Sequence, residues 1–125
     1  HSSADWRGKV VLVNFWATTC ATCVREMAQI AALHERYKAR GFETVAVSMR
    51  YDAPAAVAHY ASTRRLPFGV AIDNTGAIAE GFGDVEATPT TVLIDQRGRI
   101  VARVVGTPDF AALGGQIEDL LAAPA

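Results

Sequence analysis

The sequence predicts one α/β domain in which helices cover both faces of a central mixed β-sheet, followed by a C-terminal β-hairpin and helix. Strand-like and helix-like runs alternate through the first part of the chain, which is typical of parallel β-α-β units. Two later strand-like runs are joined by only three residues, which indicates an antiparallel hairpin. The chain has 125 residues and half of them are hydrophobic, so it suits a single core.

The first half of the chain predicts two strand–helix pairs. Residues 9–16 are a nearly continuous hydrophobic run, as in a strand covered on both faces, and residues 42–48 are a second β-branched run. A long helix is expected over 21–40, and Gly41 ends it. Another helix is expected over 54–64 and begins with Pro54. The expected apolar face of the long helix comprises Val24, Met27, Ala28, Ile30, Ala31, His34 and Tyr37.

The second half predicts three more strands and two more helices. Thr107, Pro108 and Asp109 are expected to supply an N-cap, a first-turn proline and an early acid for the last helix, which runs to about residue 121. The other predicted elements are strands over 68–72, 90–95 and 99–105 and a short helix over 77–82.

Composition excludes two classes of partner for this domain. Twelve Lys and Arg against thirteen Asp and Glu give a net charge of -1, without the basic excess that nucleic-acid binding requires. The longest aliphatic stretch, residues 10–13, is far shorter than the roughly 20 residues that span a bilayer. We treat 1–125 as one domain and expect residues 1–5, which lack an initiator methionine, to be the remnant of a trimmed end or linker.

The two cysteines, Cys20 and Cys23, stand where the first predicted strand gives way to the long helix. At a helix N-terminus, unpaired N–H groups and the helix dipole favour a thiolate, which is the form that attacks disulfides. One turn further on, Cys23 can reach the sulfur of Cys20 and resolve a mixed disulfide. The spacing therefore predicts a redox-active pair.

Three other interpretations of the pair are weaker. A structural disulfide would close a four-residue loop, worth about 2 kcal/mol against about 4.7 kcal/mol for a 100-residue loop. A zinc site would need further ligands, and there is no second cysteine pair and no ligand-like spacing between His34 and His59. Two unreactive core thiols would not explain why both cysteines stand at the start of the helix.

Residues 13–23, Arg25-Glu26-Met27 and residues 87–95 together resemble the thioredoxin superfamily. The resemblance is strongest to its bacterial TlpA/ResA-like branch, the extracytoplasmic thiol-disulfide oxidoreductases related to the cytochrome c maturation thioredoxins. It extends from about residue 6 to about residue 121, and the predicted helix over 54–64 resembles an insertion of this branch. The resemblance implies a thioredoxin-like fold.

The resemblance also implies roles for individual residues. Cys20 would be the attacking thiol, Cys23 the resolving thiol and Pro89 a cis-proline that faces them, although position alone favours an ordinary trans proline at the start of a strand. The backbone of Thr88 would bind a substrate segment as an added strand. Trp16 would flank the site, although it can equally be a core residue. The implied substrate-contacting residues are Thr88, Trp16, Thr19, Ala21 and Thr22.

The implied activity is thiol-disulfide exchange with protein cysteines, in the reducing direction, without a cofactor or metal. The resemblance implies a periplasmic or other extracytoplasmic location, a membrane protein as electron donor, a role in cytochrome c maturation, and a membrane anchor at the N-terminus outside this sequence. The residues around the cysteines also favour the reducing direction, because Ala21 and Thr22 carry no positive charge and Glu26 offsets the charge of Arg25. That leaves mainly the helix dipole, about 0.3–1 kcal/mol, to stabilise the thiolate, whereas a strong oxidant needs more.

Other functions remain open on the sequence. An oxidant or isomerase could use the same site, and a metal-carrying or redox-dead binding module could use the same fold. A peroxidase of the peroxiredoxin type is disfavoured, because Ala17 stands where that family carries threonine three residues before the reactive cysteine.

The chain departs from the pattern of the superfamily at several positions. Thr19 replaces a common tryptophan and Thr22 a common proline in the motif, and Ala28 replaces a helix-kinking proline, so we expect a straighter helix. Asn14 stands where cytosolic thioredoxins carry a buried aspartate. The proton acceptor for the resolving thiol is therefore open, with Asp52 and Glu86 as candidates.

His34 lies within the apolar face of the long helix. A histidine in this position is expected to be a hydrogen-bonded core or boundary residue and not a catalyst.

Overall fold

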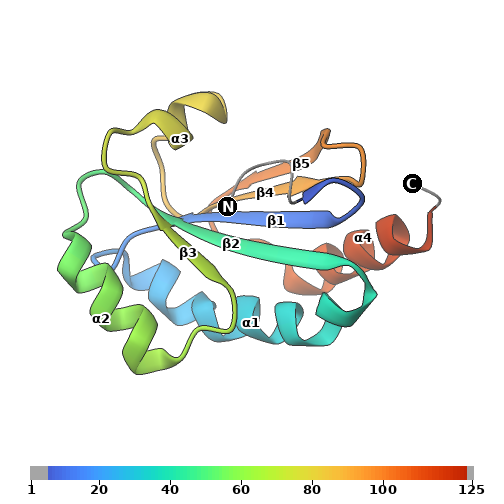
Figure 1. The fold of residues 1–125 in the computed structure, drawn as a ribbon, viewed down its shortest axis with the longest axis horizontal. Coiled ribbons are helices and arrows are strands. Elements are labelled where there is room, and N and C mark those ends of the chain that lie inside the picture. The colour runs from blue at the N-terminus through green and yellow to red at the C-terminus, as the bar shows by residue number, and fades with distance from the viewer. Residues whose placement is uncertain (1–5, 124–125) are drawn as a thin grey trace.

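The computed structural model describes residues 6–123, so the expected remnant at residues 1–5 lies outside the described residues. It contains one five-stranded sheet with the strand order β3-β2-β1-β4-β5 (Figure 1). β1, β2 and β3 are parallel, whereas β4 is antiparallel to both of its neighbours. The mixed sheet and the terminal hairpin are therefore confirmed. The strands are β1 (Val10–Trp16), β2 (Phe42–Ser48), β3 (Gly69–Ile72), β4 (Thr90–Ile94) and β5 (Ile100–Val105).

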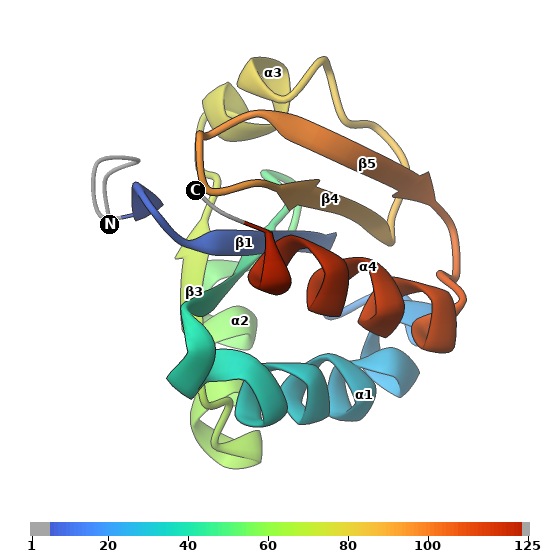
Figure 2. The same ribbon diagram turned by 90° about the vertical axis from the view of Figure 1, so that its right-hand side faces the viewer.

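Helices cover both faces of this sheet. Figure 2 shows α1 and α4 on one side of the sheet and α3 on the other, and α2 packs on the same side as α1. No helix within residues 6–123 is long and apolar enough to cross a membrane. The arrangement is the predicted thioredoxin-like α/β fold. The helices are α1 (Ala21–Tyr37), the 3-10 turn η2 (Lys38–Arg40), α2 (Pro54–Arg64), α3 (Ala77–Gly81) and α4 (Phe110–Ala122).

The central strand β1 separates two apolar layers, and all of its residues are buried. Side chains of a strand alternate between faces, so Leu12 and Trp16 pack with residues of α1 and α4 while Val13 and Phe15 pack with α3. This double coverage explains why the run in the sequence is continuously hydrophobic.

The structure corrects the expected apolar face of α1. Ala28 is exposed, whereas Glu26 and Leu33 are buried. The helix is a single unbroken element of 17 residues, as expected from alanine in place of proline. The helix also ends earlier than expected, because α1 stops at Tyr37 and the 3-10 turn η2 follows it. Gly41 caps this turn in the left-handed conformation, with a φ of 93°.

The start of α4 is a second correction. The N-cap is Asp109 and not Thr107, because the Asp109 carboxylate accepts a hydrogen bond from the backbone N–H of Ala112 at 3.0 Å. The acid therefore caps the helix from outside its first turn, and Pro108 precedes the cap.

Candidate active site

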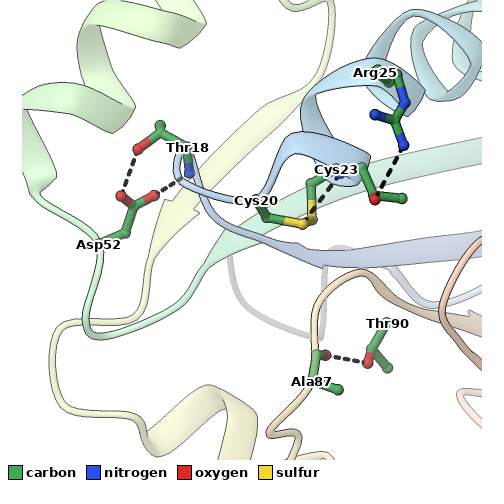
Figure 3. The surroundings of a disulfide bond; sticks show 8 residues. Thr18, Cys20, Cys23, Arg25, Asp52, Ala87 and Thr90 are labelled. Atoms are coloured by element: carbon green, nitrogen blue, oxygen red, sulfur yellow. Dashed lines mark hydrogen bonds between the residues drawn. A yellow bond between two sulfur atoms is a disulfide. The ribbon is translucent and has the colours of Figure 1, made fainter.

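The cysteine pair lies at the carboxyl end of the central strand. A turn in which the Cys20 N–H donates to the Ala17 carbonyl oxygen leads from β1 into α1, and Cys20 is the N-cap of that helix. The Cys20 sulfur accepts a hydrogen bond from the Cys23 N–H at 3.2 Å. The two cysteines form a disulfide with their Cα atoms 5.3 Å apart (Figure 3). Cys20 is partly exposed whereas Cys23 is 2% exposed, so only one sulfur is open to a partner.

The loop before β4 faces this pair. Its Thr88–Pro89 peptide bond is cis, as the resemblance implies. The Thr90 hydroxyl donates to the Ala87 carbonyl oxygen at 2.6 Å and so holds the loop (Figure 3). Because Thr90 pairs with Phe15 of β1, the sheet brings this loop beside the turn that carries Cys20. Thr88 is partly exposed and Pro89 is buried, so of the two residues of the cis bond the threonine is the accessible one.

Asp52, in the loop between β2 and α2, holds the turn that precedes Cys20. Its carboxylate accepts two hydrogen bonds from Thr18, one from the backbone N–H and one from the hydroxyl, each at 2.6 Å (Figure 3). Each carboxylate oxygen takes one of these bonds, and the residue is 5% exposed. Both carboxylate oxygens of Asp52 therefore position the turn. Glu86, the other candidate proton acceptor, is exposed, whereas Cys23 is buried.

Glu26 is a functional candidate that the sequence reasoning missed. It lies three residues after Cys23 on the buried side of α1 and is 5% exposed. Within residues 6–123, neither of its carboxylate oxygens has a hydrogen-bond partner. Residues three apart on a helix are neighbours on one face, so Glu26 shares the buried face of α1 with Cys23.

Two further buried polar side chains lie on the same side of the sheet. Asn14 and Thr91 are directly opposite each other on β1 and β4, and they face the layer in which Leu12 and Trp16 meet α1. Among the described residues, the amide oxygen of Asn14 and the hydroxyl of Thr91 have no hydrogen-bond partner. Buried polar groups are usually paired, so these unpaired groups on the side of the sheet that α1 covers are candidates for a functional role.

Trp16 is a correction among the expected substrate-contacting residues. It is fully buried and its ring packs against Tyr60, with the ring centroids 5.2 Å apart. It therefore supports the site from below and has no surface open to a substrate.

The residues around the two cysteines are more accessible. Thr19 and Ala21 are exposed, and Thr22, which accepts a hydrogen bond from the Arg25 guanidinium at 3.3 Å, is half-buried. These positions leave the face around Cys20 open to a polypeptide.

His34 is a core histidine, as expected. It is buried and its Nδ1 lies 3.1 Å from the Thr44 hydroxyl oxygen. Burial lowers the pKa of His34 below its usual value of 6.5. No group of three or more His, Cys, Asp or Glu side chains in the described part of the chain has an arrangement that could hold a metal ion.

The sequence and the fold of this chain are similar to those of known proteins. A family model described as Redoxin matches residues 1–117. The thiol-disulfide oxidoreductase ResA of Bacillus thuringiensis subsp. konkukian is 36% identical over 102 residues, which cover 82% of this chain and 58% of that protein. The chain thus spans less than two thirds of the length of that relative.

Two solved structures are similar over nearly the whole chain. The solution structure of a putative thioredoxin from Neisseria meningitidis has a TM-score of 0.90 and 38% identity, covering 96% of this chain and 79% of that one. The crystal structure of a putative thiol:disulfide interchange protein DsbE from Chlorobium tepidum has a TM-score of 0.82 and 34% identity, covering 94% and 84%.

Proposed function

Because the chain belongs to the Redoxin family, we propose that it is a thiol-disulfide oxidoreductase whose Cys20–Cys23 pair exchanges electrons with the cysteines of protein substrates. One observation carries the proposal. The pair forms a disulfide at a helix N-terminus, with one sulfur partly exposed and the other buried. This division suits a dithiol in which one thiol attacks a partner and the other releases it.

The attack begins from the reduced pair. The helix N-terminus and the Cys23 N–H stabilise the Cys20 thiolate. The thiolate attacks one sulfur of a substrate disulfide, so that a bond forms between Cys20 and that sulfur while the other substrate sulfur leaves as a thiolate and takes up a proton. The backbone of Thr88 in the opposite loop would hold the substrate segment as an added strand.

Release requires the second thiol. Cys23 loses its proton, and its thiolate attacks the Cys20 sulfur, which forms the intramolecular disulfide and expels the second substrate sulfur as a thiolate. The protein dithiol is thereby oxidised by two electrons and the substrate disulfide is reduced. Glu26 is the proton acceptor that we assign to this step, because its oxygens are buried beside Cys23 and uncommitted, whereas both oxygens of Asp52 are bonded to Thr18.

We further assign the reducing direction and a place outside the cytoplasm. Ala21 and Thr22 carry no positive charge and the guanidinium of Arg25 donates to the Thr22 hydroxyl, so the helix N-terminus is the main group that stabilises the Cys20 thiolate. The similarity to ResA supports an extracytoplasmic location, where a membrane protein would supply electrons and apocytochrome cysteines are candidate substrates.

A redox titration tests the proposal. The protein is equilibrated with dithiothreitol or glutathione buffers and the thiols are trapped by acid and alkylation. A two-electron transition near the thioredoxin value of about −270 mV is expected. A value near −120 mV, typical of a strong oxidant, would reverse the assigned direction. Absence of any transition, or stoichiometric metal on the purified protein, would replace the enzyme with a binding module.

A further inference from the structure

Two hollows adjoin each other between α1 and α2, on the side of the molecule next to the cysteine turn. The first, of about 340 Å³, is lined by Thr18 together with α2 residues that include Ala56, His59 and Tyr60. The second, of about 330 Å³, lies between α1 and the end of α2. Tyr60 and Arg64 line both hollows. We call the two together the α1–α2 groove, and Figure 1 shows these helices side by side.

The groove has an apolar floor, and its ionisable side chains other than Tyr60 are basic. On the α1 side the lining residues are Val24, Met27, Ala28 and Ala31, and among residues 6–123 no Asp or Glu lines either hollow. His59, Arg64 and Arg65 are its ionisable residues apart from the tyrosine, and all three are exposed. This excess of positive charge is local, since the whole chain has a net charge of -1.

The arginines of the groove are not engaged elsewhere. The Arg64 guanidinium lies 5.5 Å from the centroid of the Tyr60 ring, which holds it across the boundary between the two hollows. Within residues 6–123, neither Arg64 nor Arg65 forms an ion pair with a carboxylate. Their charge is thus available to a partner.

The groove adjoins the turn and the first helical turn that carry the proposed exchange site. Thr18 stands two residues before Cys20 in the same turn, and Val24 follows Cys23 directly. A polypeptide whose sulfur is bonded to Cys20 can therefore extend past Thr18 to one end of the groove. An apolar side chain of that polypeptide fits the floor, and a carboxylate next to it would meet the guanidinium of Arg64.

We propose that the α1–α2 groove docks an acidic segment of the protein that exchanges its disulfide with Cys20, with an apolar side chain in the groove and carboxylates against Arg64, Arg65 and His59. This rests on the proposed function and adds the chemistry of the partner. A small inorganic anion is disfavoured as the occupant, because it would leave the apolar floor uncovered.

The test compares two synthetic peptides with the same intramolecular disulfide, one flanked by leucine and glutamate and the other by leucine and lysine. The rate constant for reduction of each peptide by the reduced protein is measured at low and high salt. The acidic peptide is expected to react about tenfold faster at low salt, and the preference should shrink at high salt. Equal rates for the two peptides would overturn the docking proposal.

Charge variants locate the effect. Arg64→Glu should abolish or reverse the preference, and Arg64→Gln should reduce it without adding a negative charge. Arg97→Glu makes the same charge change in the exposed β4–β5 turn and should leave the preference intact. Equal losses in Arg64→Glu and Arg97→Glu would show a general effect of net charge and contradict the groove.

A neutral small disulfide, hydroxyethyl disulfide, separates this inference from the proposed function. The wild-type protein should reduce it, and Arg64→Glu should slow this reaction far less than it slows reduction of the acidic peptide, because the small disulfide does not reach the groove. If the wild type fails to reduce it, the proposed function itself fails. If it is reduced but the two peptides react alike, only the docking proposal fails.

Discussion

The two sides of the cysteine pair differ in how their polar groups are used. On the Cys20 side, the turn is open to solvent and its polar groups are bonded, since Asp52 takes both donors of Thr18. On the Cys23 side, the sulfur is buried and the nearby Glu26 has no hydrogen-bond partner in the described part of the chain. In the proposed mechanism, attack would then depend on a fixed position for the Cys20 sulfur, whereas release would depend on a free acceptor for the Cys23 proton.

Replacing each cysteine in turn should break the comparison most strongly. Cys20→Ser should abolish exchange and form no mixed disulfide, because the buried Cys23 cannot reach a partner. Cys23→Ser should still attack but fail to release, so a mixed disulfide with a peptide substrate accumulates. Non-reducing electrophoresis and mass spectrometry measure both outcomes. Mixed disulfides in Cys20→Ser would reverse the two roles.

Glu26→Gln should affect release and leave attack nearly intact. The amide keeps the size of the side chain but cannot accept a proton, so we expect release to slow about 100-fold at neutral pH. Stopped-flow measurement resolves formation and decay of the mixed disulfide as separate phases. Asp52→Asn is the matched control for loss of one carboxylate charge, and an equal slowing of release in that variant would count against Glu26.

Asp52→Ala should affect position and stability more than proton transfer. It leaves both donors of Thr18 without their acceptor, which should cost about 1–3 kcal/mol of stability. We expect a modest slowing of attack with release little changed. Asp52→Asn retains one acceptor and one donor and should recover most of the loss in urea denaturation. If alanine and asparagine are equally destabilising, the charge and not the hydrogen bonding of Asp52 is what holds the turn.

His34 should give the smallest effect, confined to stability. Burial lowers the pKa of His34 in the folded state below 6.5, so the unfolded chain binds the proton more readily. Its stabilising contribution is therefore complete above about pH 6.5 and decreases as the pH falls through the folded-state pKa. Urea denaturation between pH 8 and pH 5 should show a smaller decrease for His34→Gln, and the exchange kinetics of that variant should match the wild type.

Much of the fold could be predicted because its signals are local. The continuous hydrophobicity of β1 follows from burial on both faces, and the short connection between β4 and β5 leaves little choice but a hairpin. Caps and helix faces were less certain. Asp109 and Thr107 both stand near the start of α4 and both can cap a helix, so only the backbone geometry decides between them.

The cysteine pair and the loop before β4 were identified from motifs, but their surroundings were not. From the sequence alone Glu26 is expected to be a solvent-exposed charge that offsets Arg25, because a glutamate near a helix start usually faces water. Its phase relative to Cys23 and Leu33 shows that it is buried, and this signal was present in the sequence. The bond between Asp52 and Thr18 joins residues 34 apart, and such a contact depends on the packing of two loops.

The division between an exposed attacking thiol and a buried resolving thiol is tested most directly by alkylation of the reduced protein. Iodoacetamide labelling is followed from pH 4 to pH 9, and the labelled cysteine is identified by mass mapping. We predict that Cys20 reacts first, with a pKa below the ordinary thiol value of about 8.5, and that Cys23 reacts only when the protein unfolds. Labelling of Cys23 before Cys20, or of both at the same rate, would contradict this division.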